Sequence, residues 1–264
     1  MARGERGADD NRVRMRLLLA VSVGALAVAA LAGASTTATA GPACGDVGGE
    51  SGYAYAGHQA TYRGHGVRAT ITLARDPSVE SGHVAGWVGV GGPGQGADGE
   101  DAWIQAGVAS MPGMEPFLYA EVTRDGRDPE FMLLEQGVPV GRSHHVAVLE
   151  MSGRPGWWRV WVDGDAVTEP VQLRGSSGRW APIATAESWN GGEPACNSFS
   201  FRFERVSVSY GGGGSWRPFV PGYRFLDGGY KLRNLASAPA ETGAYSRTLT
   251  TGGVLPYAFV AASS

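Results

Sequence analysis

Apolar and polar residues alternate with a period of two along much of the chain after residue 40. In Val67–Leu73, for example, Arg68, Thr70 and Thr72 separate the apolar residues. Alternation of this kind places successive side chains on opposite faces of a strand. No segment after residue 40 shows the sustained 3.6-residue periodicity of an amphipathic helix. The pattern therefore predicts a chain that is almost entirely β-structure.

Turn signals divide this pattern into short strands. Glycine accounts for 42 of 264 residues, which suits many tight turns. Asp163-Gly164 is typical of a two-residue hairpin turn. The alternation changes phase after Phe203, which predicts a β-bulge near Glu204 and Arg205. We expect strands over residues 67–73, 83–90, 103–109, 117–123, 131–134, 143–151, 157–162, 166–173, 199–203, 206–210, 223–235 with a turn at 227–229, and 245–249. The expected fold is all-β, a two-sheet antiparallel β-sandwich.

The first forty residues have the composition of a secretory signal peptide. Arg12, Arg14 and Arg16 lie just before the apolar run Leu17–Gly33, and Ala38-Thr-Ala40 offers a small-residue cleavage site before Gly41. A retained membrane anchor is the alternative, since the run approaches the length that spans a bilayer. We expect residues 1–40 to be a signal peptide and residues 41–264 to be a single secreted domain whose last residues are loose.

Charge and cysteine content narrow the possible partners. Residues 1–40 hold five of the 22 basic and three of the 25 acidic residues, so the remaining chain has a formal net charge of 17 − 22 = −5. Nucleic acid is therefore not an expected partner, and neither is a membrane once the signal peptide is removed. We expect a monomer. Cys44 and Cys196 are expected to form a disulfide in an oxidising compartment, and a thiol nucleophile is the alternative.

Two polar residues on otherwise apolar strands are the candidates for chemistry. Gln105 lies in Trp103–Gly107 and Glu187 lies in Ile183–Trp189, where Val or Thr would be typical. A buried polar side chain without a partner costs about 1 to 3 kcal/mol, so each should meet a partner. Taken singly, Gln105 could be an interior amide satisfied by backbone and Glu187 a solvent-facing acid. If the strands over 103–109 and 117–123 pair through their short connection with coinciding faces, Glu121 lies near Gln105.

Four short blocks resemble, in order and spacing, the glutamic peptidases of the eqolisin type. The blocks begin at Trp87 (Trp-Val-Gly-Val-Gly-Gly), Trp103 (Trp-Ile-Gln-Ala-Gly-Val), Leu118 (Leu-Tyr-Ala-Glu) and Thr185 (Thr-Ala-Glu-Ser-Trp). Where that family usually has Asp-Gly after Trp-Val-Gly, this chain has Gly-Gly. Met114–Leu118 likewise replaces an acidic stretch. The resemblance implies a concanavalin A-like lectin/glucanase jelly-roll sandwich and endopeptidase activity favoured at acidic pH.

The resemblance also implies a role for each matching residue. Glu187 would be the general base and Gln105 would stabilise the oxyanion, with no metal or other cofactor. Glu121 would be a second acid that tunes the pair, with Tyr119 beside it. Trp87 and Trp189 would form the walls of a cleft around a protein or peptide substrate, and core packing is the alternative for Trp87.

Two other function classes stay open at this point. Glu121 and Glu187 could be the carboxyl pair of a glycoside hydrolase, which for a retaining enzyme requires a separation of about 5 to 5.5 Å. A non-catalytic carbohydrate-binding sandwich is the second alternative. Its stacking surface would come from Trp157, Trp158, Trp161 and Trp180, with Trp157 and Trp161 on one face beside Arg159 and with Trp158 on the other.

Overall fold

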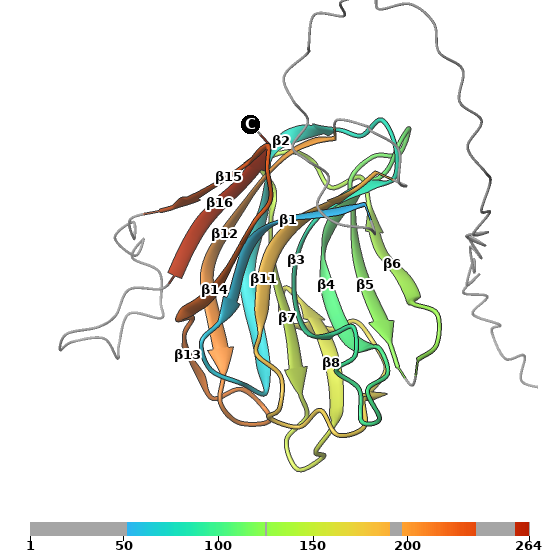
Figure 1. Ribbon diagram of the computed structural model, residues 1–264, viewed down its shortest axis with the longest axis vertical. Helices are drawn as coiled ribbons and strands as arrows, with labels where there is room; N and C mark the ends of the chain where they lie inside the picture. Colours follow the sequence, from blue (N-terminus) through green and yellow to red (C-terminus); the bar gives the residue numbers. More distant parts are fainter. Residues whose placement is uncertain (1–51, 125, 191–196, 236–256, 264) are drawn as a thin grey trace, which may run out of the picture. The chain divides into compact units, whose positions relative to one another are not determined.

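The chain folds into two antiparallel β-sheets that share one core (Figure 1). A computed structural model describes residues 52–124, 126–190, 197–235 and 257–263. Within these ranges every regular element is a strand. This confirms the predicted antiparallel β-sandwich.

The first sheet has seven strands. Their order across the sheet is β14 (Pro221–Leu226), β1 (Tyr53–Ala60), β11 (Ile183–Trp189), β3 (His83–Gly92), β4 (Ala102–Ser110), β5 (Phe117–Thr123) and β6 (Glu130–Gln136). Strand β11 pairs with β1 and β3, so a late segment of the chain lies between two early strands.

The second sheet has nine strands. Seven follow the order β10 (Val171–Gln172), β8 (Trp157–Val162), β7 (Ser143–Glu150), β2 (Gly66–Ser78), β12 (Ser198–Ser209), β16 (Tyr257–Ser263) and β15 (Tyr230–Asn234). Two short strands extend it, because β13 (Trp216–Pro218) pairs with β12 and β9 (Asp165–Ala166) pairs with β8.

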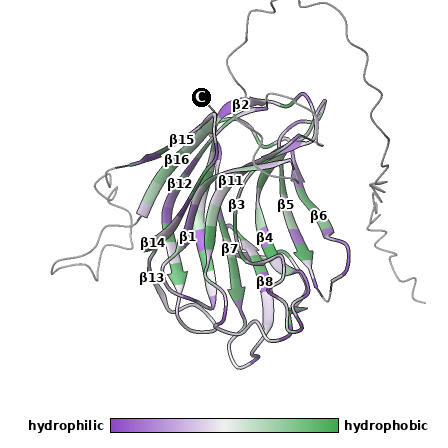
Figure 2. Ribbon diagram, viewed as in Figure 1, coloured by the Kyte–Doolittle hydropathy of each residue, from purple (hydrophilic) through white to green (hydrophobic). Residues whose placement is uncertain are grey.

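Alternate residues of each strand form the core between the sheets. From the seven-stranded sheet, Val88, Ile104 and Val108 are fully buried in it, and from the nine-stranded sheet so are Ile71 and Phe201. Figure 2 shows hydrophobic and hydrophilic residues alternating along the strands. Residues one position away point to the opposite face, and on the seven-stranded sheet that second face carries the candidate site.

Two local predictions are confirmed. The register of β12 shifts between Glu204 and Ser207, and Arg205 has a φ of 54°, as expected for a bulge. At the hairpin after β8, Asp163 and Gly164 have φ values of 52° and 100°, which matches the positive angles of the predicted two-residue turn.

Two other predictions are wrong in part. Residues 257–263, expected to be loose, form β16, because Phe259 and Ala261 are fully buried beside β12. The single strand expected over 166–173 is two short strands instead, since only β9 and β10 pair with β8. The expected signal peptide 1–40, the Cys44–Cys196 disulfide and the strand 245–249 lie outside the described residues.

Candidate functional site

The second face of the seven-stranded sheet collects the predicted site residues. Strand pairing places Glu187 opposite Tyr55 and Ala85, and it places Gln105 opposite Gly89 and Glu121. Residues paired across neighbouring strands share a face, and residues two apart on a strand share it as well. Gln105, Glu121 and Glu187 therefore all project from the face that the core does not use.

This face has an apolar cluster of its own, separate from the main core. Ala85, Trp87, Ala109, Phe117 and Tyr119 form it. Trp87 lies on β3, between the β11 strand of Glu187 and the β4 strand of Gln105. The predicted core-packing and cleft-wall roles of Trp87 are thus both compatible with its place.

Glycine at position 107 allows β3 and β4 to pack this closely under the Trp87 ring. A Cβ at Gly107 would lie 2.0 Å from the Gly86 oxygen and 2.8 Å from Trp87 Cβ, which no side chain could tolerate. The small residue opposite the tryptophan therefore fixes where the indole lies on this face.

Glu121 and Gln105 are direct cross-strand neighbours, as the sequence analysis expected. Trp103 Nε1 donates to Glu121 Oε1 at 2.8 Å, and Gln105 Nε2 approaches the same oxygen at 3.5 Å. Burial raises the pKa of the Glu121 carboxyl, and the charge of Glu187 raises it further. The Trp103 hydrogen bond and the charge of His83 act in the opposite direction.

Glu187 meets a histidine. It is only 5% exposed, and His83 Nε2 donates to its Oε1 at 3.2 Å. The His83 ring lies beside two aromatic rings, with centroid distances of 6.0 Å to Tyr53 and 5.7 Å to Trp189. The predicted wall residue Trp189 therefore contacts His83, which in turn contacts the Glu187 carboxylate.

Gln105 and Glu187 share a face but no hydrogen bond joins them among the described residues. Strand β3 lies between them, and their partners on it, Gly89 and Ala85, are four residues apart. The structure brings Gln105 to Glu121 and Glu187 to His83, with Trp87 between the two groups. A ligand on this face would lie over Trp87 and could meet both.

Three buried polar atoms on this face lack a hydrogen-bond partner among the described residues. They are Trp87 Nε1, the Tyr119 hydroxyl and Thr123 Oγ1, on side chains that are 8%, 3% and 1% exposed. Leaving such groups unsatisfied costs about 1 to 3 kcal/mol each. Similar atoms occur away from this face, at His58 and His144 for example, so they add to the case for a site here only together with the buried Gln105 and Glu187.

The pKa values of the tyrosines show that both carboxylates act on the same region. Burial raises the pKa of Tyr53, Tyr55 and Tyr119, and the charges of Glu187 and Glu121 raise each of them further. No Lys or Arg is among the causes of these shifts or of the shift at Glu121.

Sequence reasoning missed His83, Trp103 and Tyr53 as members of the site. One signal was present, because His83 has the same odd-numbered parity as Trp87 on β3 and therefore shares its face. Nothing local indicated that β11 would pair with β3 and bring Glu187 beside it.

The spacing of the strands bears on both candidate pairs. Glu121 on β5 and Glu187 on β11 have β3 and β4 between them, so three strand spacings of about 4.8 Å separate their backbones by about 14 Å across the sheet. Gln105 and Glu187 have only β3 between them, which gives about 10 Å across the sheet. The offset along the strands adds to both values. The separation of about 5 to 5.5 Å between carboxyl groups of a retaining glycosidase therefore requires more of the side chains than a water shared by Gln105 and Glu187 does.

The four tryptophans of the carbohydrate-binding alternative do not form one surface. Trp158 and Trp180 are buried and stack on each other at 6.3 Å, so neither is available to stack on a ligand, and core packing holds for both. Trp157 and Trp161 lie on the other side of β8 with Arg159, as predicted, and Arg154 lies over the Trp157 ring at 4.1 Å.

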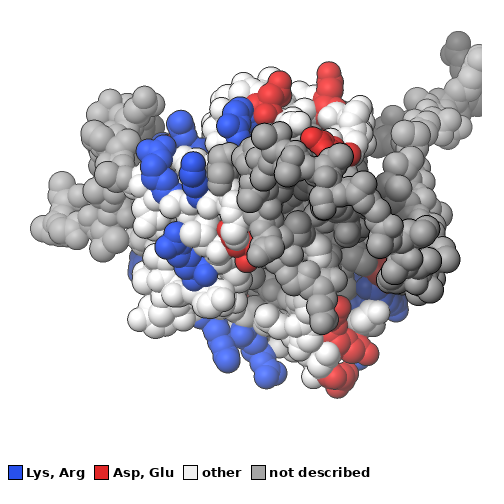
Figure 3. All heavy atoms as spheres, turned by 45° about the horizontal axis from the view of Figure 1, so that its top comes forward, with Lys and Arg blue, Asp and Glu red and all other residues white. Residues whose placement is uncertain are grey.

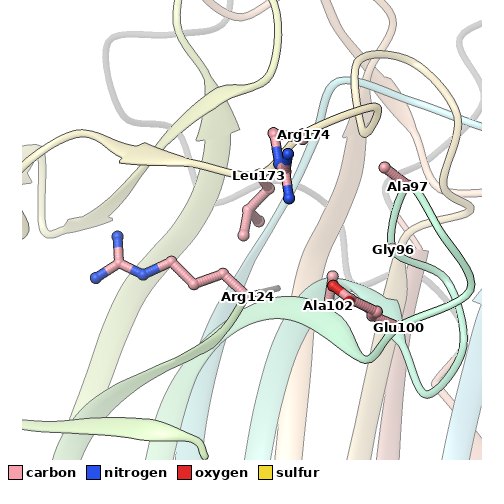
Figure 4. A pocket seen from close by; sticks show the side chains of 7 residues that line it. All are labelled: Gly96, Ala97, Glu100, Ala102, Arg124, Leu173 and Arg174. Carbon is pink, nitrogen blue, oxygen red and sulfur yellow. The ribbon is translucent and has the colours of Figure 1, made fainter. Parts of the chain in front are cut away.

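A small pocket lies elsewhere, between the loop after β3 and the segment after β10 (Figure 4). Glu100, Arg124 and Arg174 contribute its charged lining. None of the predicted site residues lines it. Arg124 is already paired with Glu130 at 2.8 Å, so the pocket offers little basis for a catalytic role.

The surface of the described residues has separate basic and acidic regions. On the face shown in Figure 3, Lys and Arg side chains lie mostly on the left and Asp and Glu side chains mostly on the right and top. The described residues contain no group of three or more His, Cys, Asp or Glu that could hold a metal ion. They also contain no helix long and apolar enough to cross a membrane.

No protein-family model and no curated protein matches this chain. Among solved structures, scytalido-glutamic peptidase bound to a transition state analogue is 14% identical, with a TM-score of 0.47, over 80% of this chain and 97% of that chain. SCP-B, a member of the eqolisin family of peptidases solved with the tripeptide Ala-Ile-His, is 13% identical, with a TM-score of 0.43 over the same shares. An alginate lyase from Pseudomonas aeruginosa is 18% identical, with a TM-score of 0.41, over 56% of this chain and 68% of that chain. The structural neighbours thus include both peptidases and a polysaccharide lyase.

Proposed function

We propose that this protein is a secreted, monomeric endopeptidase of the glutamic type, with Glu187 and Gln105 as its catalytic pair. One observation carries the proposal: a carboxylate and an amide, both more than nine-tenths buried, share the non-core face of one sheet. The unsatisfied Trp87 and Tyr119 polar atoms lie on the same face. The four-block resemblance to glutamic peptidases names the same residues.

Glu187 performs the proton transfers in this proposal. As water attacks the carbonyl carbon of the scissile peptide bond, a Glu187 oxygen accepts the proton of that water. The C–N bond of the tetrahedral intermediate then breaks, and Glu187 returns the proton to the departing amine. The carboxylate is regenerated, so that no covalent intermediate or metal ion is required.

Gln105 stabilises the charge that develops on the substrate. Its side-chain oxygen accepts a hydrogen bond from the attacking water, and its NH₂ donates to the carbonyl oxygen as that atom becomes negative. The approach of Nε2 to Glu121 at 3.5 Å gives the amide a preferred orientation. One N–H is left for the oxyanion.

Glu121 explains why acidic conditions favour the reaction. Because burial raises its pKa, this carboxyl is neutralised at a higher pH than an exposed glutamate. Protonated Glu121 no longer adds negative charge to a site in which an oxyanion must form. As pH rises, Glu121 ionises and the second negative charge opposes that step.

Digestion of an unfolded protein tests the proposal. Purified protein is incubated at acidic pH with unfolded casein and with a mixed peptide library, and the new termini are identified by mass spectrometry. We expect internal cleavage by the wild type and none by Glu187→Gln. Cleavage by Glu187→Gln at the wild-type rate would overturn the proposal. A β-glucan and an alginate are digested in parallel, and turnover of either with no peptide cleavage would favour a polysaccharide substrate.

A further inference from the structure

His83 contacts the proposed general base and has no part in the mechanism so far. It begins β3, two residues before Ala85, and its Nε2 lies 3.2 Å from Glu187 Oε1. Within the described part of the chain, no other hydrogen bond reaches the Glu187 carboxylate. Oε2 is therefore the oxygen that is left for water.

The imidazole is held in place by aromatic contacts. Tyr53 meets it edge-on, at an interplanar angle of 65°, and Trp189 lies against it at 38°. Tyr53 in turn stacks on Tyr55, with ring centroids 6.1 Å apart. A ring packed on two sides has few orientations, so the direction of its Nε2–H is fixed by packing.

Among the described residues whose charge acts on Glu121, His83 is the group that can carry positive charge. Glu187 from β11, Glu121 from β5, and Tyr53 and Tyr55 from β1 face it, and β4 adds no charged group there. The charge of His83 reaches Glu121 as well as Glu187. One imidazole therefore faces two carboxylates in a desolvated region. No Lys or Arg is among the causes of the pKa shifts of Tyr53, Tyr55, Tyr119 or Glu121.

We propose that His83 is a positioning residue for Glu187. It holds Oε1 through Nε2–H so that Oε2 takes the proton of the attacking water. This inference rests on the proposed peptidase function. A hydrogen bond to an ionised carboxylate is about twice as strong as one between neutral groups, so a single such bond can hold the base in one orientation.

Kinetics of two substitutions at one fixed acidic pH test this role. His83→Ala removes the hydrogen bond, and we expect kcat to fall by about 10- to 100-fold through loss of orientation, with KM nearly unchanged. His83→Gln retains an N–H donor, and we expect it to recover part of kcat. His65→Gln is the matched control, and its kcat per folded molecule should equal that of the wild type.

A spectroscopic measurement makes the contact testable without activity. The imidazole nitrogen-15 resonances are recorded at one fixed pH for the wild type and for Glu187→Gln. We expect the His83 Nε2 signal to move and the His65 signals to stay in place.

An unmoved His83 signal, or wild-type kcat in both His83 variants, would overturn the inference. If Glu187→Gln still cleaves peptides while the His83 signal moves, the proposed function fails and the contact survives, so the two failures are distinguishable. If His83 were the catalytic base in place of Glu187, His83→Gln would lose activity as fully as His83→Ala. That result too would contradict a positioning role.

Discussion

Two buried glutamates in this protein each meet a histidine, yet their surroundings differ. Glu150, at the end of β7, pairs with His65, and its carboxylate also accepts the Gly156 backbone N–H. The backbone of Glu150 is bonded as well. Its N–H donates to the His65 backbone oxygen at 2.8 Å, and its carbonyl oxygen accepts from the Gly213 N–H at 2.9 Å. Glu187 pairs with His83, and no backbone group donates to its carboxylate among the described residues.

The difference teaches how to tell a structural acid from a chemical one. Both carboxylates are nearly inaccessible, at 1% for Glu150 and 5% for Glu187, so burial alone does not separate them. Hydrogen-bond saturation does. Both oxygens of the Glu150 carboxylate have a partner, one in the His65 ring and one in the Gly156 N–H. Glu187 keeps one oxygen for a ligand and lies among aromatic side chains with unsatisfied polar atoms. The following substitutions test this distinction.

The largest effect is expected for Glu187→Gln. Removing a general base typically costs about 10²- to 10⁴-fold in rate, so kcat should fall by that much. The thermal midpoint should stay near that of the wild type, because the amide replaces a carboxylate with one side-chain hydrogen bond. Steady-state kinetics and a thermal melt of the same preparation measure both. A large fall in the melting midpoint would place Glu187 in the same structural class as Glu150.

Gln105→Ala should give the next largest effect. Loss of one oxyanion donor costs about 10²- to 10³-fold in kcat, with KM little changed. Gln59→Ala is the matched control, because Gln59 lies in the same cross-strand row on the same face, three strands away, with Ile183 and Gly89 between the two residues. Equal losses in the two variants would show that the face needs amides for stability and that Gln105 has no special role.

Glu150→Gln should affect stability instead of rate. An amide cannot accept both bonds of the carboxylate, and the mismatch should cost about 1 to 3 kcal/mol in the free energy of unfolding. Urea unfolding followed by tryptophan fluorescence measures this cost, and kcat per folded molecule should be unchanged. A selective loss of kcat with no loss of stability would contradict the distinction between the two pairs.

The smallest effect concerns a histidine that has no carboxylate partner. Burial, together with the charge of Arg224, lowers the pKa of His58 from 6.5 to about 4, and a hydrogen bond with Asn234 acts in the opposite direction. Its Nε2 has no partner in the described structure, and the ring lies 5.4 Å from both Tyr257 and Phe259. Folding favours the neutral imidazole. Its contribution to the free energy of unfolding is therefore fully present above pH 6.5 and is lost as the pH falls from 6.5 toward 4.

His58→Phe removes this titration while retaining an aromatic ring. After allowance for solvent screening, the wild type should lose about 1 to 2 kcal/mol more than the variant when the pH falls through that window. Unfolding free energies at several pH values give the difference in slope, which does not depend on any packing strain of Phe. Parallel curves for the two proteins would show that His58 does not titrate with folding.

Much of the fold follows from local patterns. The alternation at Val67–Leu73 identified a strand of the second sheet, and the phase change at Glu204 and Arg205 identified the bulge. The turn at Asp163 was equally local, since Asp-Gly adopts positive φ angles more easily than most pairs. These features depend on neighbours within a few residues, and therefore the sequence is sufficient to place them.

The candidate site was predictable only in part. Gln105 and Glu121 were expected to be neighbours because a short connection joins their strands, and the pairing of β4 with β5 agrees. The His83 contact was not expected, because it requires β11 to insert between β1 and β3 across a hundred residues of chain. β16 was missed for a related reason, since its burial against β12 is invisible in the weak pattern of the last residues.

Alternation within each strand had already assigned Glu187 and Gln105 to the odd-numbered face of their strands, since the two-residue repeat is a property of extended backbone alone. Strand order and register then decided which side chains meet. Backbone hydrogen bonds are equally available to many partners and alignments, so the choice among them depends on how the whole core packs. That packing placed Trp87 between the amide and the acid, and it gave the acid a histidine.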